Sequence, residues 1–506
     1  MADETWVTAE SWVTSRRGFC CSAAAAAAMV VLPAGMVGEE LEARLANDPM
    51  RPQFHLLPAK NWMNDPNGPI YFKGHYHMFF QYNPQAAVWG DMSWNHAVSE
   101  DMMHWRHLPL ALTPTPGGPD AYGCFSGTAI AVGERVYVVY TGTQISAPAL
   151  ATIRGDAKSI EETQCLAWSD DPMLVKWTKD PEPIVGRPPE GMKVTGFRDP
   201  SAWKSGDGYF MTVGSGVEGV GGCVLLYRSK DLRQWTYLHE LTGGEWDGKR
   251  TANPCDDGEM WECPDFFALG DPSNGGGHVL IYSTLGKVFW ESGLLDEGSM
   301  TFVAKKKGEL DWGAFYAPKT QVDAQGRRIL WGWIQEKRDE AAMKAAGWSG
   351  MMSLPRVLSL DADGMLRMKE LPELSVLRDG EIRVEGGKVI LPRATGEVLC
   401  VGAVGRGFTL SLRAGDVELM KVVYDAESHS FAADGRVIAL EASDRAVVHA
   451  FVDGSVVEAI LGERVGWTKR FYFAGGVAPD VVVVAEGAEK MLGWRVKAIS
   501  GGRLTA

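Results

Sequence analysis

The chain has 506 residues, of which 45% are hydrophobic and 23% charged, an ordinary composition for a globular protein of two or more domains. Its formal net charge of −14 at pH 7 leaves no basic surplus to neutralise phosphates, so no nucleic-acid partner is expected and a neutral ligand fits better. The acidity itself favours solubility and indicates no function.

The first 38 residues resemble a twin-arginine export signal. Arg16 and Arg17 precede a short apolar run over residues 23–32, and small residues follow at 33–35. The apolar run is too short to span a bilayer, so we expect export to the periplasm or the extracellular space and no other membrane contact. An Ala-rich helical tail is the alternative.

Most of the remaining sequence consists of short segments rich in Val, Ile, Tyr, Phe and Trp, separated by Gly, Pro, Asn and Asp. This pattern predicts an all-β protein. Over residues 50–358, a polar marker followed by two strands around a tight turn recurs five times. The five markers begin at Asn64, Phe125, Arg198, Glu262 and Tyr316. Such units, each of roughly 50 to 75 residues, match the blades of a five-bladed β-propeller.

Three of the five markers carry a carboxylate. Asp65 lies in Asn-Asp-Pro-Asn-Gly, Asp199 in Arg-Asp-Pro and Glu262 in Glu-Cys-Pro-Asp. If each marker begins an innermost strand, the three side chains converge at the mouth of the central channel. Aromatic residues adjoin the first motif, among them Trp62, and a wall of aromatic rings beside carboxylates suits a saccharide.

With these three motifs in this order, the chain resembles glycoside hydrolase family 32, the invertase, inulinase and levanase family. The resemblance runs from about Phe54 to Arg356 and continues more weakly to the C-terminus. It implies a five-bladed propeller followed by a β-sandwich. It also implies a hydrolase that releases terminal, non-reducing β-D-fructofuranosyl units from sucrose or short fructans.

The resemblance assigns a role to each carboxylate. Asp65 would be the nucleophile and Glu262 the acid/base of a retaining mechanism, which requires carboxyl groups about 5 to 5.5 Å apart. Asp199 would stabilise the oxocarbenium-like transition state. The Trp, Cys and Pro that adjoin Glu262 offer an apolar surround, which together with the charge of Asp65 would raise the pKa of Glu262.

Seven further residues are expected to bind the substrate, because they match family positions around the fructosyl group: Trp62, Asn64, Gln81, Trp89, Phe125, Ser126 and Arg198. Arg198 would also keep Asp199 ionised. For Gln81 and Ser126 the alternative is a purely structural role at strand ends.

Residues 372–506 differ in character from the preceding part of the chain. They alternate apolar and polar residues in short segments, with turns such as Asp453-Gly454, and predict a β-sandwich. No catalytic constellation occurs there, so we expect a supporting role.

Outside the predicted signal, six cysteines are scattered along the chain without zinc-site spacing: Cys124, Cys165, Cys223, Cys255, Cys263 and Cys400. We expect buried free thiols. The histidines are spread among strands, and the Gly-rich patches lack a strand-to-helix context, so neither a metal nor a nucleotide cofactor is predicted.

Two other functions remain open. A fructosyltransferase shares every catalytic residue, although Trp62 favours a hydrolase. A non-catalytic carbohydrate-binding propeller is disfavoured by the three intact carboxylates. The segment around Lys287 lacks an aspartate that helps many sucrose-preferring members hold glucose, so sucrose and fructan both remain as substrates. The sequence indicates no oligomeric state.

Overall fold

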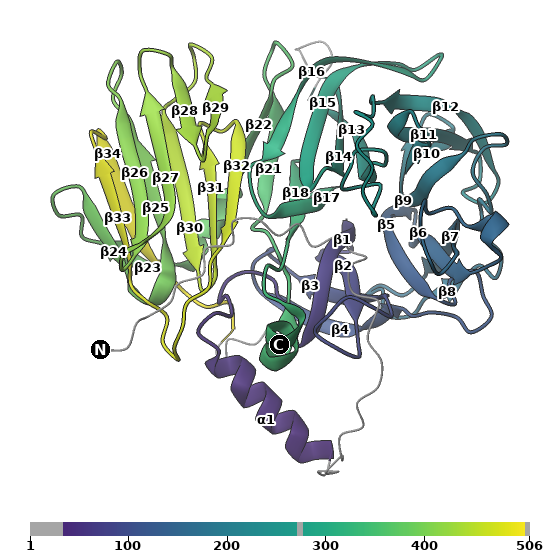
Figure 1. Ribbon diagram of the computed structural model, residues 1–506, viewed down its shortest axis with the longest axis horizontal. Helices are drawn as coiled ribbons and strands as arrows, with labels where there is room; N and C mark the ends of the chain where they lie inside the picture. Colours follow the sequence, from purple (N-terminus) through teal and green to yellow (C-terminus); the bar gives the residue numbers. More distant parts are fainter. Residues whose placement is uncertain (1–33, 271–276, 501–506) are drawn as a thin grey trace.

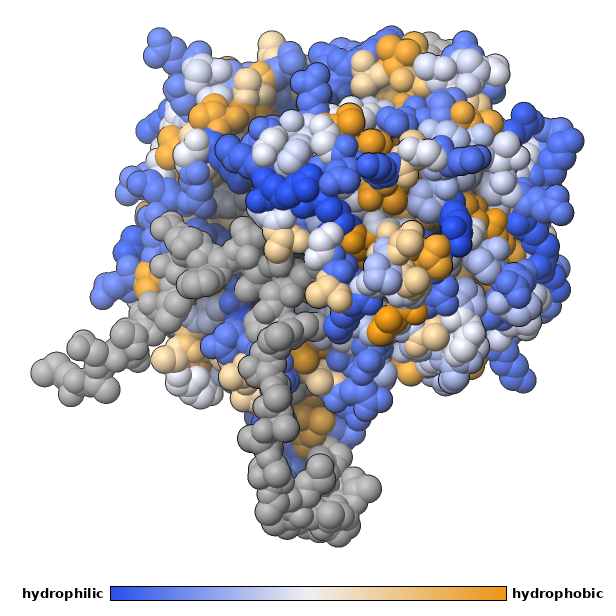
Figure 2. Space-filling view, turned by 45° about the vertical axis from the view of Figure 1, so that its right-hand side comes forward, coloured by the Kyte–Doolittle hydropathy of each residue, from blue (hydrophilic) through white to orange (hydrophobic). Residues whose placement is uncertain are grey.

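The computed structural model describes residues 34–270 and 277–500. Five blades arranged in a ring form a propeller, and two layers of strands form a sandwich beside it (Figure 1). This confirms the predicted all-β architecture. On the face shown in Figure 2, hydrophobic residues are scattered among hydrophilic ones.

Each propeller blade is an antiparallel sheet whose strands follow one another along the chain. The first blade holds β1 (Asn61–Phe72), β2 (His75–Asn83), β3 (Ser93–Ser99) and β4 (Trp105–Leu112). The second holds β5 (Gly123–Val132), β6 (Arg135–Ile145), β7 (Ile160–Ser169) and β8 (Thr178–Lys179). The third holds β9 (Val194–Ser205), β10 (Gly208–Val217), β11 (Gly221–Ser229) and β12 (Trp235–Gly243).

The last two blades complete the ring. The fourth holds β13 (Glu262–Leu269), β14 (Gly277–Thr284), β15 (Lys287–Asp296) and β16 (Thr301–Asp311). The fifth holds β17 (Phe315–Val322), β18 (Arg328–Ile334), β20 (Met351–Met352), β21 (Arg356–Leu360) and β22 (Leu366–Glu370). Late in the chain, β19 (Trp348–Ser349) pairs in parallel with β1. The first and last blades are therefore joined through the backbone.

The sandwich packs two sheets around one apolar core. One sheet holds β23 (Arg378–Ile382), β34 (Lys490–Val496), β25 (Thr395–Val401), β30 (Val447–Asp453), β31 (Val456–Leu461) and β32 (Val465–Arg470). The other holds β24 (Lys388–Leu391), β33 (Val481–Glu486), β26 (Phe408–Ala414), β27 (Val417–Asp425), β28 (Ser430–Ala433) and β29 (Arg436–Ala439). Inward-facing Val, Leu and Phe alternate with outward polar residues, as in β26.

The remaining elements of residues 34–270 and 277–500 are helical. They are α1 (Ala34–Asn47), α2 (Glu340–Ala346) and three short 3-10 turns, η1 (Pro148–Leu150), η3 (Pro372–Leu377) and η4 (Pro392–Ala394). The α1 helix projects below the propeller in Figure 1. Its Leu45 is buried, and Asp48, just beyond it, accepts a hydrogen bond from Trp348.

The predicted export signal falls mainly on residues 1–33, which lie outside the described residues. Among the described residues, no helix has the length and apolar character that crossing a bilayer requires. The six cysteines outside the predicted signal are buried and free, as expected.

All five innermost strands share one irregularity. Their pairing with the next strand shifts register at the predicted markers: at Met63–Pro66 in β1, Cys124–Gly127 in β5, Arg198–Ser201 in β9, Glu262–Asp265 in β13 and Tyr316–Lys319 in β17. A bulge bends its strand locally and changes the direction of its side chains. The five markers therefore occupy equivalent places in the five blades.

Candidate active site

Two adjoining cavities lie where the five markers meet. An inner cavity of about 250 Å³ is lined by most of the predicted site: Asn64, Gln81, Trp89, Phe125, Ser126, Arg198, Asp199 and Glu262. An outer cavity of about 280 Å³ includes Trp62 and shares Trp89 and Glu262 with the inner one. Asp65 is fully buried and is hydrogen-bonded to two residues of the inner wall. All ten predicted residues are thus brought together.

Neighbouring side chains orient the Asp65 carboxylate. The Asn64 amide donates to Oδ1 at 3.0 Å, and the Ser126 hydroxyl donates to Oδ2 at 2.6 Å. The Asn64 amide is held in turn by the Trp62 indole N–H, which donates to its oxygen at 2.6 Å. These bonds hold the carboxylate in a fixed direction.

Asp199 is fixed through its backbone. It adopts a left-handed conformation with φ of 63°, which a non-glycine residue rarely occupies. Its amide donates to the Thr141 hydroxyl at 2.9 Å, and its Oδ2 accepts from the Cys263 amide at 2.9 Å. Cys263 and Ala317, in the markers of the next two blades, also have left-handed φ values of 51° and 50°. Backbone strain of this kind clusters at functional sites.

Glu262 lies in a polar setting, not in the apolar one expected from its sequence neighbours. Arg198 donates to its Oε1 through Nε at 3.0 Å and through a terminal nitrogen at 2.9 Å. The Tyr316 hydroxyl donates to its Oε2 at 2.8 Å. Trp261 and Cys263 are buried beside it, but the bulge directs the carboxylate away from them toward these donors.

Arg198 links two glutamates. Besides Glu262, its guanidinium donates to Oε1 of Glu162 at 2.8 Å. Burial lowers the pKa of Arg198, but the neighbouring acids, Glu162 first and Asp199 among them, outweigh it and hold the pKa well above its ordinary value. The guanidinium therefore remains a cation. Its electrostatic interaction with Asp199 agrees with the sequence expectation, and its direct bonds to the two glutamates were not foreseen.

Cys263 contacts both aspartates. Its thiol lies 3.2 Å from Oδ2 of Asp199 and 3.5 Å from Oδ2 of Asp65. The thiol is buried and free of any disulfide, as expected for the cysteines outside the predicted signal. As a weak donor toward two carboxylates, it also fixes their relative positions.

Aromatic rings form much of the cavity walls. Trp89 and Phe125 meet edge to face with centroids 6.1 Å apart, and Trp62 meets Trp333 at 5.8 Å. Gln81 donates its amide to the Cys124 carbonyl at 3.0 Å while lining the inner cavity. A structural role for Gln81 is thus compatible with contact to a ligand.

Several site residues escaped sequence reasoning. Glu162, on β7, carries no marker, because a single acid within a polar-apolar strand has no distinctive pattern. Tyr316 begins the fifth marker, and this position in the repeat could have identified it as a site residue. Lys158 and Asn253 reach the cavities from long connections between strands, where sequence gives little information about side-chain placement.

Comparisons with known proteins agree with this geometry. The model of the Glycosyl hydrolases family 32 N-terminal domain matches residues 55–370. A sucrose-6-phosphate hydrolase from Escherichia coli is 38% identical over 342 residues, which are 65% of this chain and 66% of the relative. One from Bacillus subtilis (strain 168) is 32% identical over 497 residues, which are 90% of this chain and 96% of the relative.

Solved structures agree as well. A Bombyx mori GH32 β-fructofuranosidase, BmSUC1, superposes with a TM-score of 0.74 at 29% identity, covering 92% of this chain and 99% of that one. Fructan 1-exohydrolase IIa from Cichorium intybus gives 0.73 at 26% identity, covering 89% and 98%. The chain therefore belongs to glycoside hydrolase family 32 and is a glycoside hydrolase of the β-fructofuranosidase type.

Proposed function

We propose that the protein is a retaining β-fructosidase that releases terminal, non-reducing β-D-fructofuranosyl units from sucrose or short fructans. The observation that carries the proposal is that Asp199 and Glu262 line one cavity of about 250 Å³, while Asp65 is bonded to Asn64 and Ser126 of the same wall. Each of the three carboxylates has a different set of partners, which suits three different roles.

In the first step, an Asp65 oxygen attacks the anomeric carbon of the fructosyl unit. Glu262 gives its proton to the glycosidic oxygen, the bond to that oxygen breaks, and the leaving sugar departs as an alcohol. In the second step, Glu262 takes a proton from water, the water oxygen attacks the same carbon, and the bond to Asp65 breaks. The donors from Asn64 and Ser126 suit a carboxylate that attacks and is later released.

Glu262 must alternate between acid and carboxylate. Tyr316 can serve both forms, because a phenol hydroxyl donates to a carboxylate and accepts from a carboxylic acid. Arg198 bonds the other oxygen and stabilises the carboxylate form that the second step requires. Glu262 lines both cavities. If the fructosyl unit occupies one cavity and the leaving sugar the other, the glycosidic oxygen between them lies beside Glu262.

The charges of the outer cavity favour a neutral leaving group. Besides Glu262, which is protonated when the substrate binds, its wall carries four acids, Asp91, Asp256, Glu336 and Glu340, and three cations, Lys158, Lys337 and Arg338. Arg338 is paired with Glu336 at 2.7 Å, and burial lowers the pKa of Lys337. A doubly charged phosphate would therefore meet no cationic surplus in this wall.

Phosphorylated sucrose is the second candidate substrate, because two relatives are named sucrose-6-phosphate hydrolases. Initial rates on sucrose, sucrose-6-phosphate, 1-kestose and inulin would separate the substrates. We expect kcat/KM on sucrose to exceed that on sucrose-6-phosphate. The reverse order would overturn the preference for a neutral leaving group, and the absence of cleavage of any of these fructosides would overturn the proposed function.

A further inference from the structure

Two long connections between strands meet beside the two cavities. The first excursion, residues 146–159, joins β6 to β7, and the second excursion, residues 244–261, joins β12 to β13. Lys158 from the first and Asn253 from the second line both cavities, as does Glu262. The two excursions therefore form one side of the boundary at which the glycosidic bond would lie.

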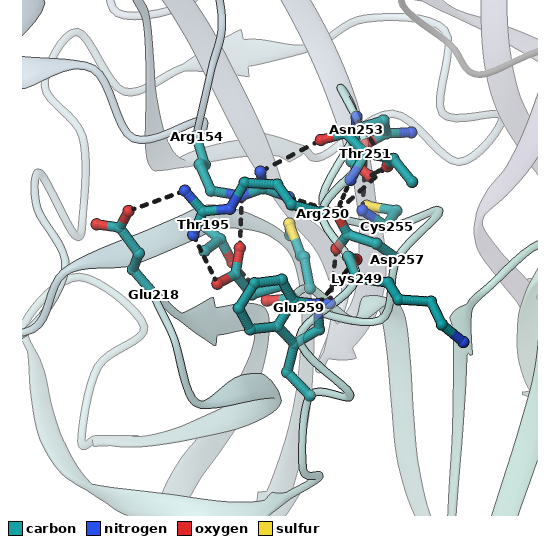
Figure 3. A network of polar contacts seen from close by, with 12 residues as sticks. Arg154, Thr195, Glu218, Lys249, Arg250, Thr251, Asn253, Cys255, Asp257 and Glu259 are labelled. Atoms are coloured by element: carbon teal, nitrogen blue, oxygen red, sulfur yellow. Dashed lines mark hydrogen bonds and ion pairs between the residues drawn. The ribbon is translucent and has the colours of Figure 1, made fainter.

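Arg154 ties the first excursion to the second (Figure 3). One terminal nitrogen lies 2.7 Å from Oδ2 of Asp257, Nε lies 2.5 Å from Oε2 of Glu259, and the other terminal nitrogen donates to the Thr251 carbonyl at 3.3 Å. The Arg154 side chain is only 9% exposed, and the two acids are buried. Figure 3 shows this side chain reaching across from its own segment into the second excursion.

Asp257 also organises the second excursion internally, and Glu259 joins it to the turn between β10 and β11. Asp257 accepts from the Thr251 amide at 2.7 Å, and the Thr251 hydroxyl donates to the Asn253 carbonyl at 2.7 Å. Glu259 accepts from the Gly219 amide at 2.6 Å through its side chain. Two buried carboxylates this close in sequence need cationic compensation, and the nearest charges come from Arg154 and, at 3.4 Å, from the half-exposed Arg250.

The proposed catalytic groups are held separately. Asp65 and Asp199 lie on β1 and β9 and bond to other strands, and Glu262 is bonded by Arg198 and Tyr316. Loosening the excursions would leave these bonds in place. The excursions contact Arg198 through the Cys255 thiol at 3.0 Å, and they contact its partner Glu162 through the Thr152 hydroxyl at 3.0 Å. The principal effect would fall on the residues at the boundary of the two cavities.

We propose that Arg154 is a positioning residue that clamps the two excursions together, fixes Lys158 and Asn253 at that boundary, and so determines how firmly the leaving sugar or an acceptor sugar is held. The proposal rests on the proposed function, because it assigns the outer cavity to the leaving group. Arg154 lines neither cavity, so in this proposal it acts on substrate binding through the residues that do.

The test is the effect of R154Q on sucrose kinetics. We expect KM to rise on the order of tenfold, because a displacement of about 1 Å at a binding wall has effects of this size or larger. We expect kcat to fall by less than about threefold, since the groups that react stay in place. At high sucrose concentration, the ratio of fructosyl transfer to hydrolysis should fall, because an acceptor sugar is held less firmly. R154K, which keeps the positive charge, should show a KM between those of R154Q and the wild-type protein.

A matched control is R464Q. Arg464 is also buried and is paired with Asp444 and Asp361, but it lies in the turn between β31 and β32 of the sandwich. This variant should lower the melting temperature and leave KM and the transfer ratio unchanged. A KM change of equal size in R464Q would mean that general loosening, not the clamp, explains R154Q.

Folded R154Q with wild-type KM and transfer ratio would overturn the positioning role. If R154Q does not fold, D257N weakens the same clamp from the other partner, and its wild-type KM would overturn the role equally. The two proposals fail in different ways. If the wild-type protein cleaves no fructoside, the proposed function is overturned. The clamp can still be tested by calorimetry, which compares the sucrose dissociation constant of D65A with that of the double variant D65A/R154Q. This comparison measures binding without turnover.

Discussion

At the scale of single residues, Asp65 and Glu262 differ in what bonds to them. Asp65 is fully buried and receives hydrogen bonds from neutral donors, whereas Glu262 faces a guanidinium and a phenol and lines both cavities. One carboxylate is thus held in a fixed direction by neutral donors, and the other lies at the opening between two cavities. This asymmetry matches a nucleophile and an acid/base.

Asp65→Ala should lower kcat on sucrose by at least about a thousandfold, because it removes the group that would form the covalent intermediate. The fold should remain intact, as judged by circular dichroism and melting temperature. Near wild-type turnover by this variant would exclude Asp65 as the nucleophile.

Glu262→Gln should slow sucrose hydrolysis more than it slows cleavage of a fructoside with an activated aryl leaving group. A good leaving group needs little protonation, so the first step loses less. Parallel kcat/KM measurements on the two substrates check this, and equal losses on both would mean that Glu262 is not the acid.

At the scale of elements, the repeated bulge explains why short motifs were enough to predict the core of the site. The Asn-Asp-Pro, Arg-Asp-Pro and Glu-Cys-Pro sequences each mark the same irregular point of an innermost strand, so the topology brings their side chains together. The excursions have no such repeat. Their placement depends on contacts between residues more than 50 positions apart in the sequence, such as Arg154 with Asp257. No local sequence pattern predicts such contacts.

The packing behind Glu262 gives a prediction at this scale. A Cβ added to Gly222 would lie 2.0 Å from Cδ1 of Trp261, so Gly222→Ala should push this ring and with it the start of β13. We expect a loss of about 1 to 3 kcal/mol of stability and a lower kcat. Gly476→Ala, where the added methyl meets nothing within 4 Å, is the control. Urea unfolding and initial rates measure both effects, and unchanged values for Gly222→Ala would contradict the packing argument.

At the scale of the whole molecule, propeller and sandwich are joined into one unit. β16 pairs with β32 at Asp311 and Gly466, so blade four and one sandwich sheet are continuous. A buried network crosses the same junction: Arg356 bonds Asp311 and Glu458, and His55 bonds Glu458 and Asp453. Sequence alone predicted the two folds but not this junction, because the charged partners lie between 45 and 403 residues apart in the chain.

The junction makes stability depend on pH. Burial lowers the pKa of His55, but bonds to Asp453 and Glu458 outweigh it and raise the pKa to about 9 from 6.5. The protonated ring therefore stabilises the fold fully below pH 6.5, and this contribution, at most about 3 kcal/mol, is lost as pH rises through 9. His449, beside Glu370 and Glu397, adds a similar effect because its pKa is also raised to about 9.

We expect the free energy of unfolding in urea to decrease between pH 6.5 and pH 9.5. His55→Gln should be less stable at pH 6.5 and should show a smaller decrease over this range. A free energy of unfolding that rises with pH in this window would contradict the charged state of His55.

In the proposed mechanism, Asp65 and Glu262 carry out a double displacement at one carbon, and the configuration of the released fructose distinguishes this mechanism from a single displacement. Two displacements restore the starting configuration, whereas an inverting site separates its carboxylates by about 6.5 to 9.5 Å to admit water. Proton NMR of sucrose hydrolysis, recorded before mutarotation, should show fructose first as the β-furanose. Initial α-fructofuranose would contradict the mechanism and mean that Asp65 activates water.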